Sequence, residues 1–171
     1  MGTVYLNGEY LGADEAKISP MDRGFLFGDG IYEVIPSYQG KMLGFGAHIE
    51  RMNNGLNELE IKLDYSADTW RKICNDLCEK NQGDNLGIYL HVSRGADTKR
   101  AHGYPTNITP TVFAFAFEIP AEPQGDIDNA TTYTVSLEQD RRWQRCHIKS
   151  TALLGNVIHY QHGAAAGNKE T

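Results

Sequence analysis

The chain has 171 residues, of which 40% are hydrophobic and 22% charged, and its formal net charge at pH 7 is −6. This acidic balance argues against a nucleic-acid-binding surface, because phosphate backbones are bound by clustered lysine and arginine. No apolar run is long enough to span a membrane, and residues 1–10 lack the basic start and apolar core of a signal peptide. The composition therefore predicts a soluble, cytoplasmic globular protein of about one to two domains that binds neither nucleic acid nor membrane.

The first predicted elements are two strands and a helix. Residues 4–6 are expected to form a strand that turns back at Asn7-Gly8, a pair that favours tight hairpin turns. A second strand is expected over 31–38, entered through Gly28-Asp29-Gly30, where glycine relieves the backbone sterics of a sharp turn. Apolar residues at helical spacing predict a helix over 48–59.

A second helix and two further strands follow. The helix is expected over 66–81, with Ser66 as its N-cap. The residues that share its predicted core face are Trp70, Ile73, Cys74 and Leu77. Strands are expected over 86–93 and 111–118, and the second strand is apolar on both faces. It is therefore predicted to be buried on both sides.

Prolines and a glycine interrupt the pattern after this strand and indicate an interdomain linker over 120–129. The predicted organisation is an N-terminal α+β domain, 1–119, and the start of a second, incomplete domain, 130–171. Within the second part we expect a strand over 131–137 and a helix over 150–166.

Lys149 is the candidate catalytic residue, because it lies at a predicted strand-to-helix junction between small and apolar residues. Partial burial would favour its neutral amine, the form that attacks a carbonyl. Taken alone, such a lysine is more often a solvated charge. The preceding Arg141, Arg142 and Arg145 fit either a local field for an anionic cofactor or a solvated strand end. The three cysteines have no metal-ligand spacing and predict neither a metal site nor a disulfide framework.

The segment RWQRCHIKSTALLGNV, 142–157, resembles the cofactor-lysine region of fold-type IV pyridoxal-phosphate enzymes. Two more motifs occur in the same order: RGFLFGDGIYE, 23–33, resembles the family's N-terminal signature, and HIERM, 48–52, resembles its phosphate-binding arginine motif. The resemblance implies a two-domain α+β and α/β fold with pyridoxal 5'-phosphate as cofactor. It further implies that Lys149 forms the Schiff base with the cofactor and that Arg51 binds its phosphate.

The segment SRGADTKRAHGYP, 93–105, resembles the Arg-x-His loop of D-amino-acid transaminases. The resemblance implies that Arg100, His102 and Tyr32 bind the substrate carboxylate. An arginine fork binds a carboxylate bidentately, and histidine and tyrosine add donors in fixed directions, so the three would set orientation as well as affinity. On residue type alone, the same stretch also fits a solvated polar loop.

The activity implied is pyridoxal-phosphate-dependent transamination of D-amino acids to 2-oxo acids, of the D-alanine/2-oxoglutarate type. The resemblance also implies a homodimer in which the loop of one subunit reaches the site of the other. Family members continue beyond this point of the sequence, so the acidic partner of the pyridine nitrogen and the phosphate-binding turns are expected outside the chain. The alternatives are another fold-type IV activity, such as an aminodeoxychorismate lyase or a branched-chain or R-selective amine transaminase, and a non-catalytic fragment.

Overall fold

The computed structural model of the chain describes residues 2–122, 125–135, 137 and 145–168. The chain divides into two compact units. The first contains Met1–Glu122 and Ile148–Thr151, and the second contains Pro123–His147 and Ala152–Thr171. The short segment around Lys149 therefore belongs to the first unit, although it follows the predicted linker.

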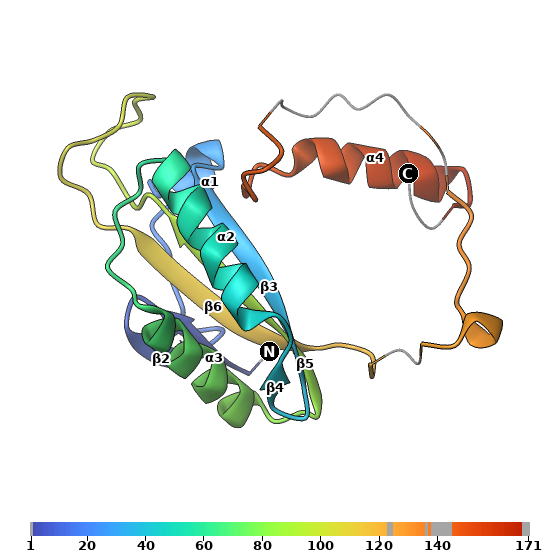
Figure 1. The fold of residues 1–171 in the computed structure, drawn as a ribbon. Helices are drawn as coiled ribbons and strands as arrows, with labels where there is room; N and C mark the ends of the chain where they lie inside the picture. The colour runs from blue at the N-terminus through green and yellow to red at the C-terminus, as the bar shows by residue number, and fades with distance from the viewer. Residues whose placement is uncertain (1, 123–124, 136, 138–144, 169–171) are drawn as a thin grey trace. The chain divides into compact units, whose positions relative to one another are not determined.

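Six antiparallel strands form one sheet in the order β2-β1-β6-β5-β3-β4 (Figure 1). The strands are β1 Thr3–Leu6, β2 Glu9–Gly12, β3 Gly30–Tyr38, β4 Lys41–Met42, β5 Asn85–Ser93 and β6 Thr111–Glu118. The turn between β1 and β2 has positive φ angles at Asn7 (49°) and Gly8 (103°), as the primed hairpin turns require. The four strands and the hairpin predicted for residues 1–118 are thus confirmed.

Four α-helices and a short 3-10 helix accompany the sheet in the described part of the chain. They are α1 Arg23–Phe27, α2 Phe45–Glu58, α3 Ala67–Asn81, the 3-10 helix η1 Ile127–Asn129 and α4 Leu154–Ala165. The expected cap of α3 is confirmed, because the Ser66 hydroxyl accepts a hydrogen bond from the Thr69 backbone at 3.1 Å. The helix therefore begins where the sequence predicted.

Two helices begin at other residues than the sequence predicted, each for a local reason. Helix α2 begins at Phe45, directly after Gly44, whose φ of 63° lies in the left-handed region. The buried Phe45 extends the apolar face of this helix by one turn. Helix α4 begins at Leu154, because the backbone around Ser150 is engaged in a β-bridge to Ile31 of β3 instead.

The core lies between one face of the sheet and the helices α2 and α3, which cover it (Figure 1). The four α3 residues predicted for the core, Trp70, Ile73, Cys74 and Leu77, are all buried. They meet side chains of the central strands such as Ile88 and Leu90. Burying one such large apolar side chain stabilises the fold by roughly 1.5–3 kcal/mol.

The prediction that β6 is buried on both sides is wrong for the opposite face of the sheet. Phe113 and Phe115 are only half-buried, and Phe117 is 40% exposed. Helices α2 and α3 lie on the other face, so this face is shielded mainly by its own rings: Tyr89 lies 5.0 Å from Phe115 and 5.6 Å from Tyr32, measured between ring centroids. The apolar pattern of β6 thus reflects an aromatic surface on one side and a core on the other.

The strand predicted over 131–137, in the second unit, is not formed among the described residues. Of the residues expected to form a strand over 131–137, residues 131–134 and 137 are not in a strand, Val135 forms a single β-bridge, and Ser136 lies outside the described residues. The predicted helix over 150–166 is confirmed as α4, four residues shorter at its start. No helix in the described part of the chain is long and apolar enough to cross a membrane.

Candidate active site

Lys149 is held beside the beginning of β3 by backbone hydrogen bonds. Its carbonyl accepts from the Tyr32 amide at 3.0 Å, and the Thr151 amide donates to the Gly30 carbonyl at 3.1 Å. The side chain of the preceding Ile148 is only 3% exposed and belongs to the hydrophobic core. The position of the lysine is therefore fixed by strand pairing and by a buried neighbour.

The amine of Lys149 lies against Tyr32. Its Nζ donates to the Tyr32 hydroxyl at 3.0 Å and lies 4.1 Å from the centroid of the same ring. Within the described ranges, no carboxylate forms an ion pair with this amine. A half-buried amine held by a phenol rather than by an acid can act as a nucleophile or a base once it is deprotonated. The structure thus brings two of the predicted site residues together.

Arg51 belongs to a Glu33 cluster, made of Glu33, His48 and Arg51. The buried Glu33 carboxylate accepts from Arg51 Nε at 2.6 Å and Nη2 at 2.5 Å, and its Oε2 lies 2.7 Å from His48 Nδ1. The hydrogen bond to Glu33 raises the pKa of Arg51 and outweighs the opposing effect of burial. Because the Arg51 side chain remains 48% exposed, its permanent charge is accessible to an anion.

Strand alternation separates Arg51 from the lysine. Tyr32 and Glu33 are neighbours on β3, so their side chains point to opposite faces of the sheet. Glu33 lies on the face covered by α2, and Tyr32 stacks on Tyr89 on the other face. In the described part of the chain no hydrogen bond joins Arg51 to Lys149. The common role implied for Arg51 and Lys149 therefore stays a prediction.

Arg100 and His102 lie together on an exposed loop, beside Phe27. The Arg100 guanidinium carbon is 4.9 Å from the centroid of the Phe27 ring, and the His102 ring centroid is 5.3 Å from it. Among the described residues, neither side chain forms a hydrogen bond or ring contact with Tyr32 or Lys149. The structure thus pairs the arginine with the histidine but does not bring either to the predicted tyrosine. Arg141 and Arg142, the other basic candidates, lie outside the described residues.

An Asp29 cluster, made of Arg23, Asp29 and Arg94, was not among the predicted site residues. Asp29 accepts from Arg23 Nε at 2.7 Å and from Arg94 through Nε at 2.8 Å and Nη2 at 3.0 Å. Burial alone would raise the pKa of Asp29, but the hydrogen bonds from the two arginines outweigh it and hold that pKa below its ordinary value. The signal in the sequence was that each of the three residues adjoins a glycine, as buried charges at tight turns can do.

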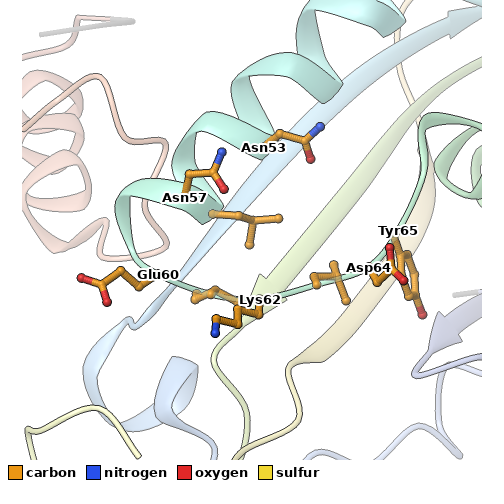
Figure 2. Close-up of a pocket in the computed structure, with 9 residues that line it drawn as sticks. Asn53, Asn57, Glu60, Lys62, Asp64 and Tyr65 are labelled. Carbon is orange, nitrogen blue, oxygen red and sulfur yellow. The ribbon is translucent and has the colours of Figure 1, made fainter. Parts of the chain in front are cut away.

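A separate cavity lies at the end of α2. Its volume is about 750 Å³, and Figure 2 shows Asn53 and Asn57 on α2 and Glu60 and Lys62 on the segment that follows. None of the predicted site residues lines this cavity. It is therefore distinct from the region around Lys149 and Tyr32.

Comparison with known sequences gives a consistent result. A family model described as amino-transferase class IV matches residues 30–171. D-alanine aminotransferase of Staphylococcus haemolyticus is 38% identical over 159 residues, which cover 92% of this chain and 55% of that protein. D-alanine aminotransferase of Listeria innocua is 33% identical over 157 residues, covering 91% and 53%. The chain thus spans about half the length of these relatives.

Solved structures share the fold at low sequence identity. The branched-chain amino acid aminotransferase of Escherichia coli superposes with a TM-score of 0.84 at 18% identity, covering 98% of this chain and 57% of that one. A putative 4-amino-4-deoxychorismate lyase from Legionella pneumophila superposes with a TM-score of 0.75 at 20% identity, covering 92% and 56%. At such identities the similarity concerns the arrangement of the backbone only.

Proposed function

This chain belongs to the amino-transferase class IV family and has the expected α+β fold of the fold-type IV enzymes, and on that basis we propose that it forms part of a pyridoxal-phosphate-dependent D-amino-acid aminotransferase. The proposed reaction converts a D-amino acid, with D-alanine as the model substrate, into its 2-oxo acid. The observation that carries the proposal is the contact between Lys149 Nζ and the Tyr32 hydroxyl at 3.0 Å. The 38% identity to D-alanine aminotransferases supports the substrate class.

The donor set of this chain fits pyridoxal 5'-phosphate. When bound, the cofactor supplies an aldehyde that reacts with amines and a pyridine ring that acts as an electron sink. Lys149 offers the half-buried primary amine that such an aldehyde requires. Arg51 offers a half-exposed guanidinium, oriented by Glu33, for the phosphate. These two residues would hold the cofactor.

Lys149 and Tyr32 would handle the proton that moves in the reaction. In its neutral form the Lys149 amine takes the proton from the substrate Cα as a general base, and as the ammonium it returns a proton as a general acid. The Tyr32 hydroxyl is close enough to hold the amine in place between these two tasks. It also offers a donor to the substrate carboxylate.

Arg100 and His102 would bind that carboxylate together with Tyr32. Both are exposed side chains beside Phe27, and in the described part of one chain they make no contact with Tyr32. This arrangement supports a homodimer in which the loop of one subunit serves the site of its partner. A bidentate arginine contact in that site would favour amino acids over simple amines.

The test is an absorption spectrum of the full-length protein with pyridoxal phosphate, recorded before and after addition of D-alanine and, separately, L-leucine. Loss of the visible cofactor band with D-alanine alone is the expected result. Loss with L-leucine alone would move the assignment to a branched-chain activity, and no response to either would contradict an aminotransferase. Lys149→Ala is the control, because it should remove the band.

The substrate pair is tested by replacement. In Arg100→Met and His102→Phe the Michaelis constant for D-alanine should rise strongly, because carboxylate recognition is lost. Steady-state kinetics with D-alanine and 2-oxoglutarate measures this change. An unchanged Michaelis constant would favour another fold-type IV chemistry, such as lyase or amine transaminase activity.

A further inference from the structure

Arg23 holds the tip of the loop that carries Arg100 and His102. Its Nη1 donates to the carbonyls of Ala101 at 2.6 Å and Gly103 at 3.3 Å, and its Nη2 donates to the carbonyl of His102 at 3.1 Å. Its Nε is occupied by Asp29 at 2.7 Å. One side chain thus contacts three consecutive loop carbonyls and a carboxylate at the same time.

The chemistry of the guanidinium suits this task. Arg23 is only 3% exposed, so water screens its charge-assisted hydrogen bonds very little. Its planar fork presents several N–H groups in fixed directions, whereas a lysine would offer a single flexible point charge. Arginine can therefore bind the loop carbonyls with a fixed geometry, and lysine cannot.

The carboxylate that orients Arg23 is itself fixed. Arg94, 4% exposed, donates to both oxygens of Asp29, and its guanidinium carbon lies 3.6 Å from the centroid of the Tyr104 ring. Both arginines that bind Asp29 therefore contact the loop. Arg23 binds its backbone carbonyls, and Arg94 stacks on its Tyr104 ring. Asp29 would keep a bidentate partner if Arg23 were removed.

The backbone of the α1 region runs along the start of the same loop. The Arg23 amide donates to the Gly95 carbonyl at 2.9 Å, and Asp22 forms a β-bridge with Ala96. The Phe27 ring, one turn further along α1, contacts the side chains of both Arg100 and His102. The α1 region thus touches the loop at its start, at its tip and at the two side chains that the loop presents.

We propose that Arg23 is a positioning residue for the substrate-carboxylate pair Arg100 and His102. It fixes the backbone on both sides of the histidine, so that the two side chains reach a substrate with a set spacing and direction. This inference rests on the proposed function, because it names the residue that prepares its carboxylate site. Arg23 itself does not contact the substrate.

The experiment compares Arg23→Met and Arg23→Lys with Arg71→Met in the full-length protein. Arg71 is the control arginine, because it is an exposed residue of α3 that stacks on Phe45 of α2 at 4.1 Å. Three quantities are measured in each variant: hydrogen exchange of peptides covering 100–104, the spectrum of the bound cofactor, and the steady-state constants for D-alanine.

In Arg23→Met, amide exchange over 100–104 should accelerate by about 10-fold or more, while β5 and β6 keep their protection. The Michaelis constant for D-alanine should rise by about 10-fold to 100-fold, because small displacements of positioned groups are costly, and kcat should change much less. The cofactor spectrum should stay unchanged. Arg23→Lys should fall between wild type and Arg23→Met, and it also provides the measurement if Arg23→Met fails to fold.

Wild-type exchange over 100–104 in both variants would overturn the inference, as would faster exchange with an unchanged Michaelis constant. A loss of kcat and of cofactor in proportion to the rise in the Michaelis constant would also overturn it, because that pattern reports general destabilisation. If the wild-type spectrum does not respond to D-alanine, the proposed function fails before any variant is compared. A wild-type response together with unaltered variants would reject only the role of Arg23.

Discussion

The two arginine–carboxylate clusters beside β3 differ in where their guanidinium groups lie. In the Asp29 cluster both arginines are buried, with Arg23 3% and Arg94 4% exposed. In the Glu33 cluster the carboxylate is fully buried, but Arg51 is 48% exposed. The first cluster directs its remaining N–H groups to loop carbonyls, whereas the second keeps an accessible positive charge.

The difference follows from the place of each carboxylate in the fold. Asp29 lies directly before β3, and the carbonyls that its two arginines contact, those of residues 101–103 and of Leu59, belong to irregular backbone without strand partners. Glu33 lies inside β3 beneath α2, where the strands and the helix already satisfy the backbone. The buried guanidinium groups of Arg23 and Arg94 therefore bind backbone carbonyls, whereas the guanidinium of Arg51 on α2 stays half-exposed beside Glu33.

The largest effect on the difference between the two clusters is expected from Asp29→Ala. It leaves Arg23 and Arg94 buried without a counter-charge, which should lower the free energy of unfolding by about 3–5 kcal/mol. Urea denaturation followed by circular dichroism measures the change. Asp64→Ala removes an exposed carboxylate and serves as the control, with an expected change within about 0.5 kcal/mol. A similar loss in both variants would show that the Asp29 cluster is not special.

Protonation of Asp29 at low pH removes the charge of the same cluster and leaves the side chain in place. Because the folded-state pKa of Asp29 is lowered, its contribution to stability is present above the unfolded-state pKa, about 3.9, and is lost as the pH falls through the folded-state value. The melting temperature of wild type should therefore decline more steeply below about pH 4 than that of Asp29→Asn. If the melting temperatures of the two proteins fell equally steeply with decreasing pH, the stabilising role of ionised Asp29 would be contradicted.

Glu33→Gln tests the half-exposed cluster. Arg51 can regain water when the charge of Glu33 is removed, so we expect a smaller loss of about 1–3 kcal/mol in the free energy of unfolding. If Arg51 binds the cofactor phosphate as proposed, the freed guanidinium should hold it with a less defined geometry, and the dissociation constant for pyridoxal phosphate should rise. Urea denaturation and a fluorescence titration measure the two effects. A loss as large as that of Asp29→Ala would remove the contrast between the clusters.

The smallest effect is expected at an ion pair whose lysine lies on the surface. Lys72 donates to Asp76 at 2.6 Å within α3, but its side chain is 75% exposed. Lys72→Met should lower the free energy of unfolding by only about 0.3–0.5 kcal/mol. The same urea series at low and high salt provides the check, since an exposed pair should be weakened by salt and the Asp29 cluster should not.

The sequence predicted correctly those elements that are determined by neighbouring residues, such as a helix with its own cap and apolar face. Ser66 and the apolar face that begins at Trp70 determine α3, and both were visible in the sequence. Helix α2 was predicted one turn short, because Gly44 and Gly46 flank the buried Phe45 and conceal the start of its apolar face. The strand predicted over 131–137 was wrong, since an alternating pattern does not show whether a neighbouring strand is present to pair with it.

The sequence predicted that Tyr32, Arg100 and His102 act together, but it did not predict the contact between Tyr32 and Lys149. The motifs named Lys149 and Tyr32, and strand pairing then brought them together. The contact between Arg23 and the carbonyl of His102 joins residues distant in sequence through a backbone atom, which no residue type reveals. Such contacts follow only from the fold, and for that reason Arg23 was not among the predicted site residues.

The strand order has a consequence for how the molecule is made. Strand β1, near the start of the chain, pairs with β6, and β6 is the last strand of the sheet along the chain. During synthesis the N-terminal hairpin must therefore wait until β6 has left the ribosome, and contacts of such long sequence separation form slowly. The segment of Lys149 emerges later still and joins the edge of β3. Lys149 is thus added to a sheet in which β1 and β6 can already be paired.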